Sequence, residues 1–356
     1  MRVVIAPDSF GEALTAAQAA AAIARGWLEA APDDEVELVP LSDGGPGFAA
    51  AVATASPDSH WLGPGLVQIG ATAYVESAVG CGRDRIRAVG AAVGTGSTYD
   101  VGAMVRVTAT APGVETVVVG LGGSVTNDGG AGAWAALGAA PADGLGAGGL
   151  GLAGLDRLTM PPPLGVRLVA AADVDNPLLG PHGASHSYGP QKGAGAATVA
   201  ALEAAMTHWA DLVEAATGLA GLRDEPGAGA AGGLGFGLLA LGAQRVPGVD
   251  LVADALGLAD RIAAADLVIT GEGRYDATSL RGKAVAGVAQ RALVAAVPCI
   301  VLAGDATVGR RQAAAHGVDA IHTVAELFGS VEAGIAAGEP GLHRLARETA
   351  RQRRHV

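Results

Sequence analysis

The chain has 356 residues, of which 50% are hydrophobic and 3% aromatic, and its formal net charge is −12. This length predicts two domains or one large α/β domain with an ample apolar core. The negative charge argues against nucleic-acid binding, which needs a broad basic surface.

Short apolar runs alternate with alanine-rich stretches along the chain. We expect β-strands at residues 2–7, 35–40, 116–122, 166–173, 266–273 and 298–305. We expect helices at residues 15–31, 130–139, 198–216 and 283–297. This alternation predicts an α/β fold with parallel sheets whose faces are covered. Ligands of such sheets bind beyond the carboxyl ends of the strands, so the polar residues found there are candidate site residues.

Six polar, mostly glycine-containing segments follow apolar runs. They are Asp8 with Ser9, then residues 43–47, 120–132, 171–194, 227–235 and 270–283. Any one of them alone is typical of an ordinary turn, because Asp and Gly are the residues that turns need. Their repeated position at the ends of apolar runs favours a shared site.

The residue types in these segments suit phosphoryl transfer. Glycine-rich turns that enter helices present backbone N–H groups to anions, and Ser124, Thr126 and Asn127 add donors. Carboxylates that could hold Mg²⁺ or accept a proton are Asp8, Asp43, Asp173, Asp175, Glu272 and Asp276. Lys192, Lys283 and Arg274 could neutralise a transferring phosphoryl group. The set indicates transfer from a nucleotide.

The only two lysines, Lys192 and Lys283, both lie in glycine-flanked polar segments, whereas every other basic residue besides histidine is arginine. A lysine is a compact, flexible point charge, which suits contact with phosphate. The sequence lacks the P-loop, the G-x-G-x-x-G dinucleotide pattern, the G-x-S-x-G elbow and H-E-x-x-H. His182 and His186 are four apart, but glycine breaks the segment, so we do not expect a metal pair there.

Cys81 and Cys299 are too few for a disulfide framework and lack metal-ligand spacing, so we expect both to be reduced and buried. The apolar runs are shorter than the roughly 20 residues of a membrane span. The first strand is too short to be a signal peptide, so we expect a cytoplasmic protein.

The segments taken together resemble the bacterial-type glycerate kinases over essentially the whole chain. "GLGGSVTNDGGAG", "DVDNPLLGP" and "GPQKGA" carry the resemblance most specifically. It implies ATP- and Mg²⁺-dependent phosphorylation of D-glycerate, with the 2-hydroxyl favoured over the 3-hydroxyl as the acceptor. It also implies two α/β domains, one Rossmann-like with a parallel sheet (1–57 with 260–356) and one inserted (58–259), with the active-site cleft between them. Partners are then glycerate and ATP, with neither nucleic acid nor membrane, in a monomer or homodimer.

The resemblance assigns candidate roles residue by residue. Catalytic candidates are Asp173, Lys192, Asp276 and Lys283. Nucleotide-binding candidates are Asp8, Ser9, Asp43, Gly44, Gly45, Gly122, Gly123, Ser124, Thr126, Asn127 and Asp128. Substrate candidates are Glu76, Asp175, Asn176, Gln191 and Arg274, and the metal candidates are Asp8, Asp43 and Glu272.

Three positions depart from the family pattern. Gly11 stands where the family commonly has lysine, and Pro46 and Phe48 stand where it has glutamate and threonine. These changes leave two alternatives open. The protein could be a kinase for another small hydroxy acid, or a nucleotide- or metabolite-binding regulator without turnover.

Overall fold

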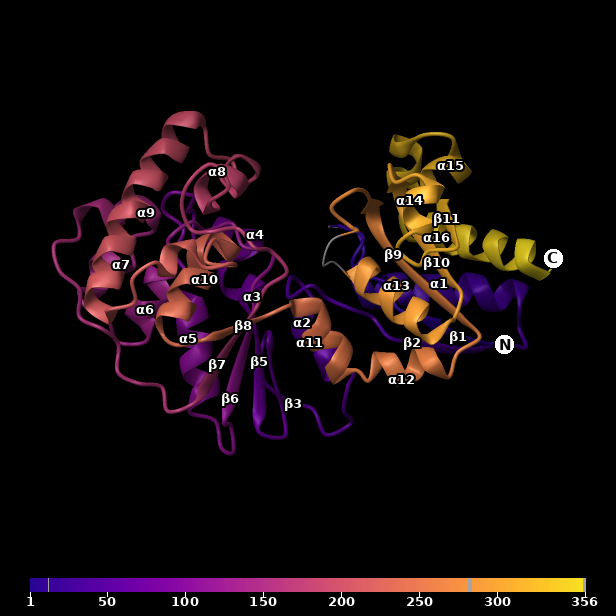
Figure 1. Ribbon diagram of the computed structural model, residues 1–356, viewed down its shortest axis with the longest axis horizontal. Helices are drawn as coiled ribbons and strands as arrows, with labels where there is room; N and C mark the ends of the chain where they lie inside the picture. Colours follow the sequence, from indigo (N-terminus) through magenta and orange to yellow (C-terminus); the bar gives the residue numbers. More distant parts are fainter. Residues whose placement is uncertain (12, 281–283, 355–356) are drawn as a thin grey trace. The chain divides into compact units, whose positions relative to one another are not determined.

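The computed structural model describes residues 1–356 except 12, 281–283 and 355–356. The chain forms two compact units (Figure 1). Unit 1 comprises Met1–Asp43 and Val249–Val356, and unit 2 comprises Gly44–Gly248. Unit 2 is therefore inserted between the two segments of unit 1.

Unit 1 contains a fully parallel sheet of five strands, in the order β11-β10-β9-β1-β2. The strands are β1 (Arg2–Ile5), β2 (Glu35–Leu38), β9 (Leu267–Tyr275), β10 (Cys299–Ala306) and β11 (Ala320–Thr323). The helices are α1 (Ala16–Ala30), α11 (Gly248–Ala255), α12 (Leu258–Ala263), α13 (Ala284–Ala295), α14 (Arg310–Ala314), α15 (Val324–Phe328) and α16 (Val331–Arg354). The strand order reverses between β1 and β9, since β2 lies on one side of β1 and the later strands lie on the other.

The core of unit 1 forms because α1 is amphipathic and correctly capped. Thr15 accepts a hydrogen bond from the Gln18 backbone, and the Gln18 side chain accepts one from the Thr15 backbone, which satisfies two N–H groups at the start of the helix. Ile23 and Trp27 are buried against the sheet and against Leu342 of α16. Burial of large apolar side chains of this kind contributes roughly 1.5–3 kcal/mol each.

Unit 2 contains a mixed sheet in the order β3-β4-β5-β6-β7-β8. The strands are β3 (His60–Gly63), β4 (Leu66–Ile69), β5 (Thr72–Glu76), β6 (Thr116–Gly120), β7 (Arg167–Ala171) and β8 (Gln244–Val246). The last four pair in parallel, whereas β3, β4 and β5 form an antiparallel meander. The predicted all-parallel pattern is wrong for this meander, because short turns at Gly65 and Gly70, both with positive φ, reverse the chain.

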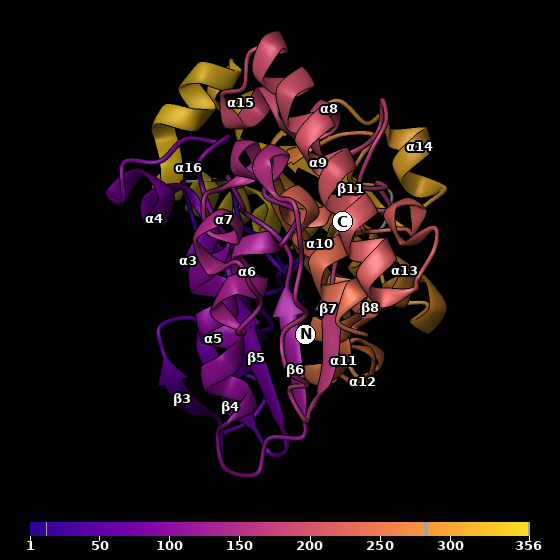
Figure 2. The same cartoon turned by 90° about the vertical axis from the view of Figure 1, so that its left-hand side faces the viewer.

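The helices of unit 2 are α2 (Phe48–Ala53), α3 (Ser77–Cys81), α4 (Arg83–Ala88), α5 (Tyr99–Ala109), α6 (Ala131–Ala136), α7 (Ala142–Leu145), α8 (Ala184–Tyr188), α9 (Ala196–Thr217) and α10 (Ala230–Ala240). Helix α5 packs across β5 and β6 (Figure 2). Trp134 and Trp209 meet edge to face at 5.4 Å between ring centroids, and each indole N–H donates to a backbone carbonyl. The two tryptophans are the largest side chains of a buried cluster that also contains Phe236, Met206 and Leu178.

Both units are α/β, as the sequence predicts, and the predicted strands and helices are all present. Cys81 and Cys299 are free and buried. Within the part of the chain that the structure describes, no helix combines the length and the apolar character that crossing a membrane requires.

Candidate functional site

In unit 1, predicted site residues gather at the carboxyl edge of the sheet. Asp8 follows β1, and its backbone N–H donates to the Gly271 carbonyl of β9 at 2.8 Å. Glu272 is therefore carried on the neighbouring strand, where it is 8% exposed. The Asp8 carboxylate accepts a hydrogen bond from the Ser9 N–H at 2.7 Å. Asp43 ends the segment that follows β2, on the other side of β1.

Arg274 and Asp276 lie at the end of β9. The Arg274 side chain is 67% exposed, and its Nε lies 4.0 Å from Asp276 Oδ2. Asp276 Oδ1 accepts hydrogen bonds from the Thr278 N–H at 2.8 Å and the Thr278 hydroxyl at 2.7 Å. This turn holds one carboxylate oxygen and directs the other toward the guanidinium. Lys283 lies outside the described residues.

In unit 2, the glycine turns touch one another through their backbones. A Cβ on Gly122 would stand 2.5 Å from the Gly45 Cα, and one on Gly44 would stand 3.1 Å from the Ala171 carbonyl oxygen. Any side chain at position 122 would separate the two turns. Gly123, with φ +67°, faces the Pro46 ring in the same way, at 2.7 Å. Glycine here serves close backbone approach, at the carboxyl end of β6.

The polar residues after this turn are largely buried. Asp128 accepts hydrogen bonds from the Thr98 N–H at 2.7 Å, from the Thr98 hydroxyl at 2.9 Å, and from the Gly130 and Gly132 N–H groups at 3.2 Å each. Burial raises the pKa of Asp128, and these donors lower it. The carboxylate thus ties the start of α5 to the start of α6. A role in holding the loop accounts for its position, alongside the predicted role in nucleotide binding.

Asn127 and Thr126 are also completely buried, and Ser124 is half-buried. Asn127 Nδ2 donates to the Ser185 hydroxyl at 3.0 Å, and the Ser124 and Thr126 hydroxyls lie 2.9 Å apart. The 227–235 segment packs on this loop, because a Cβ on Gly232 would stand 2.0 Å from the Thr126 carbonyl oxygen. That segment belongs to the packing of the site loop.

Lys192 lies against the same loop. It ends the 3-10 segment Pro190–Lys192, and its Nζ donates to the Thr126 carbonyl at 2.7 Å and lies 6.0 Å from the Tyr188 ring centroid. Burial lowers the pKa of Lys192 to about 8, against smaller opposing effects of Cys81 and Asp128. Burial raises the pKa of the Cys81 thiol to about 11. The lysine is thus a cation held in a partly buried polar cluster.

The segment after β7 carries the remaining candidates. Asp173 is half-buried, and Asp175, whose side chain is 81% exposed, forms an ion pair with Arg245 at 2.5 Å. Asn176 donates to the His182 carbonyl at 2.6 Å and accepts from the Tyr188 hydroxyl at 2.6 Å. Asn176 therefore organises its own loop.

Gln191 and Glu76 differ sharply in exposure. Gln191 is exposed next to Lys192. Glu76 is buried, and its two carboxylate oxygens accept hydrogen bonds from the Gly47 N–H at 2.9 Å and the Ala49 N–H at 3.1 Å, at the start of α2. Burial raises the pKa of Glu76, and the two N–H donors oppose this effect. Glu76 thus fixes helix α2 from within unit 2.

The three departures from the family pattern have separate surroundings. Gly11 has φ +58° with open space around a built Cβ, so a lysine there would be strained rather than crowded. Pro46 is exposed and packs on Gly123, whereas Phe48 is fully buried and meets Tyr74 edge to face at 6.1 Å. Phe48 therefore belongs to the core of unit 2.

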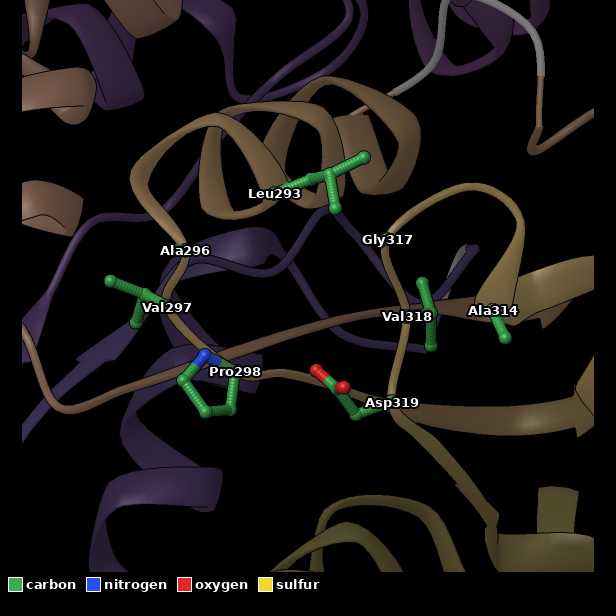
Figure 3. A pocket seen from close by; sticks show the side chains of 8 residues that line it. All are labelled: Leu293, Ala296, Val297, Pro298, Ala314, Gly317, Val318 and Asp319. Carbon is green, nitrogen blue, oxygen red and sulfur yellow. The ribbon is translucent and has the colours of Figure 1, made fainter.

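No group of three or more His, Cys, Asp and Glu side chains among the described residues is arranged to hold a metal ion. Among the described residues, unit 1 contains a cavity at each edge of its sheet. One, of about 270 Å³, lies at the amino edge of the sheet between Leu293, Pro298 and Val318 (Figure 3). Asp319 also lines this cavity. Its carboxylate accepts a hydrogen bond from the Cys299 N–H at 2.7 Å and so supports the fold. The other, of about 260 Å³, lies at the carboxyl edge.

Sequence reasoning missed several residues of these surroundings. Asp305 is the last residue of the strand predicted at 298–305 and lines the carboxyl-edge cavity, and its position at the end of an apolar run was the available signal. The sequence assigned no role to Thr98 or Tyr188, because each contacts a predicted residue, Asp128 or Asn176, only through the tertiary fold.

The acidic residues at the strand ends, the glycine turns and the partly buried lysine are typical of one class of protein. That class is the α/β phosphotransferases. The sequence model of the glycerate kinase family matches residues 3–354. The glycerate kinase of Halalkalibacterium halodurans is 38% identical over 98% of this chain and 97% of its own length. The glycerate 2-kinase of Escherichia coli K12 is 37% identical over the same shares. The crystal structure assigned as glycerate kinase 2 from Salmonella typhimurium LT2 superposes with a TM-score of 0.75 at 34% identity, covering 100% of this chain and 98% of that one.

The chain therefore belongs to the glycerate kinase family, whose members are phosphotransferases that act on an alcohol group.

Proposed function

We propose that this protein phosphorylates the 2-hydroxyl group of D-glycerate with ATP and Mg²⁺. Family membership supports glycerate as the acceptor, and the relative named glycerate 2-kinase supports the 2-position. The observation that carries the chemistry is the polar cluster of Lys192 on the glycine-rich loop, because a cation held on such a loop suits a phosphoryl group.

The residues of unit 1 fit a magnesium ion. Asp8, Asp43 and Glu272 supply hard oxygen ligands at the carboxyl ends of neighbouring strands. Mg²⁺ in kinases takes one or two carboxylates and completes its shell with phosphate oxygens and water, so a preformed cage of three carboxylates is not required. Bound Mg²⁺ would neutralise charge on the phosphates of ATP. The role of the protein is to hold these carboxylate oxygens in place.

Lys192 has the charge for a role at the phosphoryl group. With a pKa of about 8, its ammonium is mostly protonated at neutral pH. The Thr126 carbonyl holds Nζ in position, so little reorganisation is needed when negative charge develops nearby. Lys283, outside the described residues, is proposed as a second cation.

Asp173 or Asp276 would orient or deprotonate the glycerate hydroxyl. The Thr278 hydrogen bonds fix Asp276 Oδ1 and so orient this carboxylate. Arg274 is exposed enough to hold the glycerate carboxylate through two parallel hydrogen bonds. Gln191, exposed beside Lys192, is proposed as a further substrate contact. The proposed roles draw on residues of both units.

The test is incubation of the pure protein with ATP, Mg²⁺ and D-glycerate, followed by NMR of the product. We expect 2-phosphoglycerate and ADP in equal amounts. Formation of 3-phosphoglycerate would overturn the assignment of the 2-hydroxyl as the phosphorylated group. A higher kcat/KM for another hydroxy acid would overturn the assignment of glycerate as the acceptor. Thermal stabilisation by ATP without any ADP formation would indicate a binding protein instead.

A further inference from the structure

Apart from Arg274, the residues that line the carboxyl-edge cavity of unit 1 have no role in the chemistry described above. Its volume is about 260 Å³. The loop after β1 and the ends of β9 and β10 form one side, and the first turns of α16 form the other. Lining residues include Phe10, Ala13, Leu14, Arg274, Asp305 and Ile335. All of them belong to unit 1.

The cavity lies where the topology places ligands. Taken in chain order, the strands of unit 1 have the order 2-1-3-4-5, and the order reverses between β1 and β9. Open α/β sheets bind ligands in the crevice outside the carboxyl ends of the strands at this reversal. Phe10, five residues after β1, and Gly273, near the end of β9, both line the cavity. It therefore opens at the reversal point itself.

One wall of the cavity is an apolar helix face that the protein leaves exposed. Val331 and Ile335 of α16 are four residues apart, so they lie on one side of the helix. They are 40% and 73% exposed although both are large and apolar. Phe10 and Leu14 form the opposite apolar surface and are nearly buried. Two facing apolar surfaces suit a flat, apolar ligand group.

The charged side chains that line the cavity are Arg274, whose proposed role is given above, and Asp305, which is an acceptor. No hydrogen bond or ion pair joins the Asp305 carboxylate to another described residue. A carboxylate only accepts hydrogen bonds, so its natural ligand partner is a donor such as a ribose hydroxyl or an exocyclic amine. A carboxylate on the ribose hydroxyls is a recurrent feature of nucleotide-binding α/β folds.

We infer that this cavity binds the nucleoside part of the phosphoryl donor, with the base between α16 and the side chains of Phe10, Ala13 and Leu14 and with Asp305 accepting from a ribose hydroxyl. The inference rests on the proposed function. It is consistent with the neighbouring residues, because Asp8 precedes Phe10 by two positions and Glu272 precedes Gly273 by one. The donor phosphates would thus lie next to the proposed metal carboxylates.

Two variants test the cavity with kinetics. Ala13 is exposed, so Ala13→Trp narrows the cavity without disturbing the core. We expect the KM for ATP to rise tenfold or more, with the KM for glycerate and the unfolding midpoint close to wild type. Val294→Trp is the matched control, because Val294 is 79% exposed on α13 and does not line the cavity. Asp305→Asn should raise the KM for ATP about fivefold, and this effect should disappear when 2′-deoxy-ATP is the donor.

Calorimetric titration with ATP separates this inference from the proposed function. Wild-type turnover with unchanged ATP affinity in Ala13→Trp and Asp305→Asn would overturn the cavity assignment and leave the kinase proposal intact. A rise in the KM for glycerate alone would overturn it as well. If both variants bind ATP more weakly than the wild type, and the wild type does not phosphorylate glycerate, the cavity assignment is supported and the kinase proposal is refuted.

Discussion

The carboxyl edges of the two sheets use similar residues in different ways. In unit 2, Glu76, Asp128 and Asn176 accept hydrogen bonds from their own unit, and Asp128 is fully buried. In unit 1, Asp276 is one-third exposed and Arg274 is two-thirds exposed, beside a cavity. The comparison teaches that an acidic residue after a strand can either build a loop or present a group to a ligand. The burial of Asp128 and the exposure of Asp276 and Arg274 distinguish the two cases.

Lys192 is the exception in unit 2, because the Thr126 carbonyl of the glycine-rich loop holds its ammonium group and yet it is proposed to act on the phosphoryl group. Lys192→Ala should lower kcat by about 10²–10³, the usual cost of removing one positioned donor from a site where charge develops. The measurement is glycerate-dependent ADP formation at saturating substrates. If kcat stays near wild type, Lys192 belongs with the loop-building residues. The unfolding free energy of the same variant shows whether any loss of activity is structural.

A matched pair of isosteric changes tests the comparison directly. Asp128→Asn places an amide NH₂ among four buried donors and should lower the free energy of unfolding by about 3 kcal/mol. Asp8→Asn keeps the Oδ1 acceptor of Ser9 and should cost less than about 1 kcal/mol. Urea denaturation gives both values. Equal losses of stability would remove the distinction between the two edges.

The pH dependence of activity sharpens the assignment of Lys192. Its pKa in the folded protein is lowered from 10.5 to about 8, so the ammonium loses its proton as the pH rises through 8. We expect kcat/KM to fall by about tenfold per pH unit above that value. Lys192→Arg should abolish this limb, because arginine stays protonated. A wild-type profile flat to pH 10 would contradict a role for the ammonium.

The free energy of unfolding should also depend on the Lys192 proton, but it should rise with pH where the activity falls. Between pH 8 and 10.5 the unfolded chain binds the lysine proton more strongly than the folded one, so this group makes folding more favourable as the pH rises. Comparison of wild type with Lys192→Met by denaturation at pH 7 and pH 10 isolates the contribution. An equal difference in stability at the two pH values would contradict the lowered pKa.

The smallest effect is expected at Asp175. Its side chain is 81% exposed and its ion pair with Arg245 lies at the surface. Surface pairs of this kind contribute roughly 0–1 kcal/mol, so Asp175→Asn should change stability by less than about 0.5 kcal/mol. If Asp175 contacts glycerate as the sequence predicts, the KM for glycerate rises in the variant. An unchanged KM would assign Asp175 to the loop alone.

Sequence periodicity identified most of what positions the site. The strands predicted at 116–122 and 266–273 are β6 and β9, and the polar residues that follow them stand at the carboxyl edges. The β3–β5 meander was not predicted, because its strands of four or five residues lie next to one another without a helix between them. Asp305 was not selected, because its strand ends without the glycine-rich turn that marked the others.

The sequence by itself determined the α/β class, the glycine turns and the residue types that suit phosphoryl transfer, since periodicity and composition are local properties. Tertiary structure alone decided which of those residues serve the fold. Nothing near Asp128 in the sequence shows that Thr98, thirty positions earlier, donates two hydrogen bonds to it. Burial and hydrogen-bond partners depend on segments distant in the chain, so a motif can indicate a site residue without revealing its role.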